Sequence, residues 1–126
     1  MSVTVLVVDD NQDNVEIIRS ILLRQGFDVR VAGDGESALH AVHEKAPDLI
    51  LLDIMMPGIN GLEVLDRLKA NPRTASLPVI LVTARSEDDD VLAGYKGGAE
   101  YYLTKPFSRR QLLYAIGLVL GAETAG

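Results

Sequence analysis

The residues best suited to chemistry in this sequence each follow a run of apolar residues. Asp9 and Asp10 follow VTVLVV, and Asp53 follows LILL. Thr83 follows VILV, and Lys105 follows EYYLT. Burying a carboxylate without a partner costs on the order of several kcal/mol, so an acid at the end of a buried segment needs an explanation. Three acids, a hydroxyl and an amine in equivalent positions suggest one shared site.

The hydrophobic pattern predicts the elements that must position these residues. Five apolar runs have the length of strands, at residues 3–8, 27–32, 49–52, 79–82 and 100–104. Between them, apolar residues recur three and four positions apart, which is typical of helices, at residues 13–25, 36–45, 62–70, 88–96 and 109–120. Strand and helix alternate five times, and this predicts an α/β fold with a parallel sheet.

The predicted strands differ in kind, which indicates their order in the sheet. The first, third and fourth are continuously apolar, as expected when helices cover both faces. The second alternates, with residues 27, 29 and 31 on one side and 28 and 30 on the other, and the fifth is mixed. We therefore expect the second and fifth at the edges of a doubly wound sheet in the order 2-1-3-4-5. The pattern alone also allows the three inner strands to be permuted.

Glycine, proline and serine mark several predicted helix ends. Gly26 follows the first helix, Pro72 follows the third, and Ser86 is expected to cap the fourth. The fourth helix also contains Gly94 and ends in Gly97–Gly98. One interpretation is an unusually mobile helix, because interior glycine is unfavourable. The other is that one of the paired glycines is an ordinary C-terminal cap.

The predicted topology brings the polar residues to one edge of the sheet. In an open α/β sheet, ligands bind at the carboxyl ends of the strands where the strand order reverses, here between the first and third. Asp9, Asp10 and Asp53 would meet there, and neighbouring carboxylates need a cation. Oxygen ligands without cysteine favour Mg²⁺, or Mn²⁺, over zinc, and Lys105 would balance the remaining charge. The alternative is three loop acids that are solvated separately.

The composition limits the function classes. The chain has 126 residues, 48% of them hydrophobic and 24% charged, which is typical of one soluble domain. A net charge of −6 argues against a nucleic-acid surface, and no segment resembles a signal peptide or a membrane span. The absence of cysteine fits a cytoplasmic protein. We expect one domain over residues 1–126, no output domain, and a frayed tail over 121–126.

Four segments together resemble a known family. They are VLVVDD, LILLDIMMPGINGLE, ILVTA and YYLTKPF, which occur in this order and each at the end of a predicted strand. With them the chain resembles, over essentially its full length, the receiver domain of a two-component response regulator. The resemblance implies a flavodoxin-like, three-layer fold with the strand order 2-1-3-4-5 of chemotaxis receivers.

The resemblance also implies the role of each site residue. Asp53 would accept a phosphoryl group from a histidine kinase or a phosphotransfer histidine. Asp10, Asp53 and the backbone carbonyl of Met55 would hold Mg²⁺, and Asp9 would assist through water. The chain would be a phosphorylation-controlled switch, with no enzyme activity beyond its own phosphorylation and dephosphorylation.

Further residues of the resemblance would bind the phosphoryl oxygens. Lys105 would pair with one oxygen, and its peptide bond to Pro106 would be cis. The Thr83 hydroxyl and the Ala84 amide would bind the others, and the small side chain of Ala84 would leave room for the donor.

The output would follow from the same resemblance. Phosphorylation would draw Thr83 inward, and Tyr102 would rotate into the space behind it. The changed surface would consist of the fourth helix, the fifth strand and the fifth helix. Met55 and Arg85, two residues beyond Asp53 and Thr83, would tune the lifetime of the phosphoryl group.

A surface for partners can be placed on that region. Tyr95, Tyr102, Tyr114 and Leu118 would form an apolar patch for a protein target or a dimer. The alternative is ordinary scattered apolar residues. We expect a kinase or phosphotransfer protein upstream, an unidentified protein target downstream, and a monomer or a weak phosphorylation-dependent dimer. We expect no nucleic acid or membrane partner.

Three other readings fit part of the sequence. GDGESA, residues 33–38, matches a dinucleotide-binding fingerprint, but it follows an edge-type strand and leaves the acids and Lys105 without a role. An aspartate-nucleophile phosphatase shares most of the site but usually has a second acid where Met55 stands, and it needs a cap domain. A receiver-like protein that binds partners without phosphorylation also remains open.

Overall fold

A computed structural model describes residues 2–121, so most of the tail predicted over 121–126 lies outside the described residues. The strands are β1 (Thr4–Val8), β2 (Asp28–Ala32), β3 (Leu49–Leu52), β4 (Val79–Thr83) and β5 (Tyr101–Thr104). The helices are α1 (Gln12–Arg24), α2 (Gly35–Glu44), α3 (Gly61–Ala70), α4 (Asp88–Lys96) and α5 (Arg109–Leu120). Each bound lies within one residue of its prediction.

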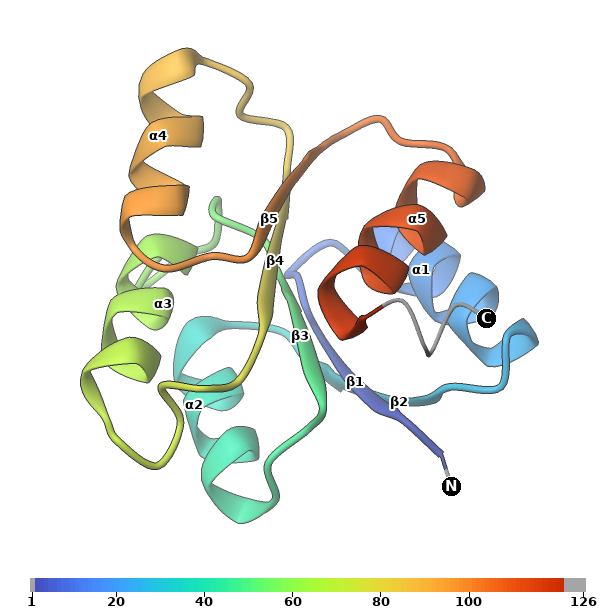
Figure 1. The fold of residues 1–126 in the computed structure, drawn as a ribbon, viewed down its shortest axis with the longest axis horizontal. Coiled ribbons are helices and arrows are strands. Elements are labelled where there is room, and N and C mark those ends of the chain that lie inside the picture. The colour runs from blue at the N-terminus through green and yellow to red at the C-terminus, as the bar shows by residue number, and fades with distance from the viewer. Residues whose placement is uncertain (1, 122–126) are drawn as a thin grey trace.

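The sheet is parallel and has the order β2-β1-β3-β4-β5, which confirms the predicted doubly wound topology and its edge strands. Helices α1 and α5 cover one face, and α2, α3 and α4 cover the other, so the fold has three layers (Figure 1). The register pairs Val8 of β1 with Leu52 of β3. The residues that follow these two, Asp9 and Asp53, therefore leave the sheet side by side.

The core has two halves because the central strands are buried on both faces. Leu6, Ile50 and Leu81 pack toward α2 and α3, while Val7 and Leu51 pack toward α1 and α5. This explains why β1, β3 and β4 are uninterrupted apolar runs. The two packed layers hold the strand ends, and with them the polar residues, in fixed positions.

The helix starts show one departure from prediction. The side chains of Asn11, Asp34, Asn60 and Ser108 each accept a hydrogen bond from a backbone N–H of the helix that follows. The prediction that Ser86 caps α4 is wrong, because Glu87 stands at that position and its side chain makes no capping bond among the described residues. Three acids in the first turn of α4 stabilise its start electrostatically instead.

Gly26 ends α1, as the sequence predicts. Its φ of +88° is the left-handed conformation expected of a helix-terminating glycine. Among the described residues, no helix combines the length and the apolar character needed to cross a bilayer.

Candidate functional site

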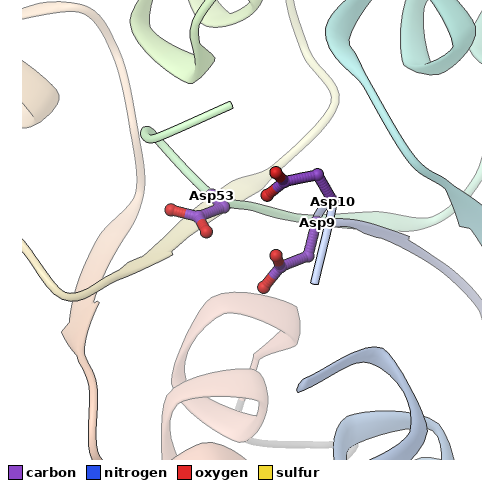
Figure 2. A group of neighbouring side chains, drawn as sticks. All are labelled: Asp9, Asp10 and Asp53. Carbon is purple, nitrogen blue, oxygen red and sulfur yellow. The ribbon is translucent and has the colours of Figure 1, made fainter. Parts of the chain in front are cut away.

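Three carboxylates meet at the carboxyl ends of β1 and β3. Asp9, Asp10 and Asp53 each place a carboxylate oxygen within 4.8 Å of those of the other two. Figure 2 shows the three side chains grouped at the ends of the two strands. Asp9 and Asp53 are only 4% and 6% exposed, whereas Asp10 is exposed to solvent. The predicted convergence is therefore present, and two of its three acids are buried.

Lys105 supplies the positive charge of this cluster. Its Nζ lies 2.7 Å from Asp9 Oδ2 and 3.2 Å from Asp53 Oδ2. Burial alone would lower the pKa of Lys105, but the hydrogen bond to Asp9 and the charge of Asp53 outweigh burial, and the pKa lies above its ordinary value. Lys105 is therefore a cation at neutral pH, held between two buried acids.

Asp53 has its two oxygens in different surroundings. Oδ1 accepts a hydrogen bond from the backbone N–H of Met55 at 3.0 Å, and Oδ2 faces Lys105. Oδ1 of Asp9 is held in a similar way by the N–H of Asn11 at 2.9 Å. These bonds fix the orientation of both buried carboxylates. The side chain of Met55 is 52% exposed, beside the acids.

The ends of β4 and β5 bring two more predicted residues to this edge. The N–H of Lys105 donates to the carbonyl of Thr83 at 2.8 Å, so the two residues leave the sheet together. The Thr83 side chain is fully buried, and its hydroxyl accepts a long bond, 3.4 Å, from the N–H of Arg85. Ala84, between them, is exposed. The Lys105–Pro106 peptide bond is cis.

The structure adds Gly61, which the sequence did not single out as a site residue. A Cβ on Gly61 would lie 2.1 Å from the backbone oxygen of Asp53 and 2.7 Å from the Cα of Ile54. The N–H of Gly61 also donates to the carbonyl of Ile54 at 2.9 Å. The start of α3 thus packs directly on the backbone of Asp53. A glycine after the Asn60 cap was the available signal, but nothing in the spacing shows the close approach.

Tyr102 lies differently from its expected place in an exposed patch. It is 8% exposed, and its hydroxyl donates to the carbonyl of Arg85 at 2.7 Å. Burial, followed by the charge of Asp90, raises the pKa of Tyr102. The remaining patch residues are exposed, as expected: Tyr95 at 45%, Tyr114 at 62% and Leu118 at 53%. The correction has a simple cause, because the ring fills space between β5 and α4 that the sequence pattern does not show.

Arg85 lies beside the acids but does not contact them. Its guanidinium pairs with Asp90 of α4 at 3.2 Å. An open hollow next to the cluster is lined by Asp10, Met55 and Arg85, among others. The two residues predicted to affect phosphoryl lifetime therefore face the same hollow.

The donor set fits a hard divalent cation. The three acids offer only oxygen ligands, they are close enough to share one ion, and the exposed Asp10 opens the cluster to solvent.

Comparisons with known proteins agree with the fold and the site. The family model "Response regulator receiver domain" matches residues 5–117. The DNA-binding response regulator MtrA of Mycobacterium tuberculosis is 42% identical over 109 residues, which cover 86% of this chain and 46% of that protein. The chain spans about half the length of the curated relatives it matches.

Two solved structures share the whole fold. Chemotaxis protein CheY4 of Vibrio cholerae has a TM-score of 0.90 at 28% identity, covering 95% of this chain and 100% of that one. A CheY-like receiver domain protein from Methanospirillum hungatei has a TM-score of 0.90 at 26% identity and covers both chains completely. The chain belongs to the response regulator receiver domain family. It is therefore a signalling switch, and its acidic cluster is typical of the Mg²⁺ site of receivers.

The dinucleotide reading of residues 33–38 is not supported. This segment follows β2, an edge strand away from the crevice between β1 and β3. A Cβ on Gly35 would lie 2.5 Å from Ile59 and 2.8 Å from Val64, so this glycine allows close packing of α2. Its presence is explained by the fold of a receiver.

Proposed function

We propose that Asp53 accepts a phosphoryl group from a phosphohistidine in a Mg²⁺-dependent reaction. The donor would be a histidine kinase or a phosphotransfer protein. The observation that supports this most is the arrangement of Asp9, Asp10 and Asp53 within 4.8 Å of one another, with Lys105 between two of them. A structural ion pair would need one acid, not three, and would not leave Asp10 open to solvent.

The chemistry assigned to Asp53 follows from its surroundings. One carboxylate oxygen attacks phosphorus, a P–O bond forms, and the P–N bond to the donor histidine breaks. Lys105, already 3.2 Å from Oδ2, is placed to pair with a phosphoryl oxygen. The Thr83 hydroxyl and the Ala84 N–H are assigned to the remaining oxygens, and the small Ala84 leaves space for the donor.

The metal ligands we assign are Asp10, Asp53 and the backbone carbonyl of Met55, with Asp9 assisting through water. Mg²⁺, or Mn²⁺, would supply charge neutralisation for the incoming phosphoryl oxygens. Met55 and Arg85 line the hollow next to Asp10, and we assign them to the control of phosphoryl lifetime.

The output we propose uses the surface of α4, β5 and α5. Thr83 accepts from the N–H of Arg85, and the carbonyl of Arg85 accepts from the hydroxyl of Tyr102. A new bond from Thr83 to a phosphoryl oxygen would act on the short segment that also holds Tyr102. The exposed Tyr95, Tyr114 and Leu118 of this surface would contact the partner.

The partners we propose follow from this surface and from the charge. Residues 1–126 would act as one receiver unit in the cytoplasm, as a monomer or a weak phosphorylation-dependent dimer. The net charge of −6 favours a protein target over DNA, although the relative MtrA is named a DNA-binding regulator.

The test is intact mass after incubation with acetyl phosphate and Mg²⁺. We expect one phosphoryl group on the wild type and none without Mg²⁺. Asp53→Asn should remain unmodified, and Asp66→Asn, the same change at an exposed position of α3, should be modified like the wild type. A wild type that stays unmodified with several phosphodonors would make the chain a phosphorylation-independent binding module.

A further inference from the structure

The ring of Tyr102 rests on the backbone of α4 at Gly94. A Cβ built on Gly94 would lie 2.9 Å from Cδ2 and 3.2 Å from Cε2 of Tyr102, and 2.7 Å from Cδ1 of Leu81. Distances of 2.7 and 2.9 Å are shorter than real Cβ contacts, so a side chain at position 94 would force Leu81 or the Tyr102 ring to move. The ring therefore keeps its present place against a position without a side chain.

Tyr102 is also bonded on both sides to the segment that contains α4. Its hydroxyl donates to the carbonyl of Arg85, in the loop before the helix. Its backbone N–H donates to the hydroxyl of Tyr95, within the helix, at 3.2 Å. The N–H lies on an edge strand, so the Tyr95 hydroxyl replaces a bond that a further strand would make.

Helix α4 has few other attachments to the core. Among its described residues only Gly94 is buried, and the N-cap residue before the helix, Glu87, makes no side-chain capping bond. Val91 packs against the α2–α3 half of the core but is only partly buried. The contact of the Gly94 backbone with the Tyr102 and Leu81 side chains is therefore the place where α4 packs most closely on the sheet.

We propose that Gly94 is a positioning residue for the surface of α4, β5 and α5. Because it has no side chain, the Tyr102 ring packs directly on the backbone of α4, and the positions of the ring and the helix depend on each other. This packing of the ring on Gly94 is present while Asp53 is unmodified, so it defines the conformation of the α4 surface before phosphorylation. Its consequence for signalling rests on the proposed function, whereas the packing itself does not. This gives Gly94 a packing role that neither sequence-based interpretation assigned to it. The C-terminal cap expected at one of the paired glycines is confirmed, because Gly97 is the C-cap residue of α4 and Gly98 follows it with φ of +104°.

The first test uses the unphosphorylated protein. The chain has four tyrosines, so it can be labelled with 3-fluorotyrosine, and Tyr102→Phe identifies the Tyr102 resonance in ¹⁹F NMR spectra. In Gly94→Ala we expect that resonance to shift and to broaden with a soluble paramagnetic probe, as for an exposed ring. Gly97→Ala is the matched control, because position 97 faces Leu65 and not Tyr102. An unchanged, protected Tyr102 resonance in Gly94→Ala would overturn the proposal.

A second variant, Tyr102→Ala, decides the proposal if Gly94→Ala folds poorly. If the added methyl clashes with the ring, Gly94→Ala should lower the urea midpoint less in a Tyr102→Ala background than in the wild type, because the ring that the methyl meets is then absent. An equal loss in both backgrounds would overturn the proposal, because the defect would then lie elsewhere.

Phosphorylation separates this inference from the proposed function. With an adduct on Asp53, the wild type should show shifts at both Tyr95 and Tyr102, and Gly94→Ala should lose the Tyr95 shift because the helix no longer follows the ring. An equal Tyr95 shift in both proteins would contradict the coupling. Absence of any adduct would contradict the proposed function, and the unphosphorylated comparison would still decide the role of Gly94.

Discussion

Among single residues, Lys105 is the cation that pairs with both buried acids of the cluster. It contacts Asp9 Oδ2 and Asp53 Oδ2, and Asp53 is one of the residues that we propose as Mg²⁺ ligands. The ammonium and a bound Mg²⁺ would therefore compete for the same negative charge. This competition leads to a measurable prediction about metal affinity.

In Lys105→Met we expect Mg²⁺ to bind about tenfold more tightly, equivalent to about 1.4 kcal/mol, because a nearby positive charge is removed. Phosphorylation by acetyl phosphate should nevertheless be slower, since one phosphoryl-binding group is lost. Isothermal titration with Mg²⁺ measures the first effect. Lys96→Met removes the same charge from an exposed position and should change neither quantity. Weaker Mg²⁺ binding in Lys105→Met would contradict the assignment.

Gly61 leads to a second prediction at this scale. Because its Cβ would lie 2.1 Å from the Asp53 carbonyl oxygen, Gly61→Ala must displace the loop that holds Asp53. We expect a loss of about 2–4 kcal/mol of unfolding free energy and slower phosphorylation of the folded fraction. Urea unfolding and adduct formation by mass measure the two effects. Gly33→Ala, where a Cβ would meet nothing within 4 Å, is the control and should leave phosphorylation unchanged.

The sequence predicted the acids and Lys105 for a physical reason. Each stands at the carboxyl end of a predicted strand, Asp9 and Asp10 after the first, Asp53 after the third and Lys105 after the fifth, and parallel strands bring such residues to one edge. The packing roles of Gly61 and Gly94 were not predicted, and Tyr102 was expected to turn inward only on phosphorylation. They depend on how closely one backbone approaches another element, and this approach leaves no periodic trace in the sequence.

Among the helices and strands, the end of α3 is connected to the edge of the sheet by the ion pair between Lys69 and Glu100. Lys69 Nζ donates to the carbonyls of Ala75 and Leu77, at 3.1 and 3.0 Å, and lies 3.3 Å from Glu100. Glu100 also accepts from the N–H of Val79 at 2.7 Å. The pair therefore holds the loop before β4 and the start of β5 together, far from the acids.

Lys69→Met should lower the unfolding free energy by about 1–3 kcal/mol, because the two carbonyls and the carboxylate lose their donor. Arg67→Met, on the same helix, breaks an exposed pair with Glu36 and should change it by less than about 0.5 kcal/mol. Urea unfolding distinguishes them. Equal effects would show that Lys69 acts only as a surface charge. Neither variant should alter the yield of the Asp53 adduct.

The elements themselves were predicted almost completely, because the period of apolar residues and the caps agree over most of the chain. The exception is the start of α4, where Ser86 was the wrong cap. A capping side chain must accept a hydrogen bond from an N–H of the first turn, which follows it, and a serine near a helix start does not show whether it does so. Three acids at Asp88–Asp90 make a side-chain cap less necessary there.

At the scale of the whole molecule, two raised pKa values predict loss of stability at alkaline pH. Folding favours protonated Lys105 and neutral Tyr102, whose ordinary pKa values are 10.5 and 10.0. Above these values the unfolded chain loses the protons first, so the stabilisation is lost as pH rises through the folded pKa values. Each group contributes a slope of at most about 1.4 kcal/mol per pH unit.

The measurement is the urea midpoint from about pH 9, below both ordinary values, to about pH 12, above both of them. The variant Lys105→Met/Tyr102→Phe should show a flatter decline than the wild type. Tyr114→Phe, at a tyrosine that is 62% exposed, should decline like the wild type. A wild-type midpoint independent of pH over this range would contradict the charge arrangement.

The doubly wound sheet explains why one small domain can combine these features. The order β2-β1-β3-β4-β5 places the acids at the reversal between β1 and β3, and Thr83 and Lys105 on the next strands. The same β4 and β5 contact α4 through Tyr102 and Leu81. A reaction at the acids and a change at the α4 surface are therefore separated by only two strands.

The acceptor that we propose, Asp53 itself, can be identified directly. An aspartyl phosphate is reduced by borohydride to an alcohol, so phosphorylated aspartate becomes homoserine and can be located by peptide mass spectrometry. After incubation with acetyl phosphate and Mg²⁺, followed by borohydride, we expect homoserine at position 53, with Asp9 and Asp10 unchanged. Homoserine at another position, or at none although the mass adduct is present, would contradict it.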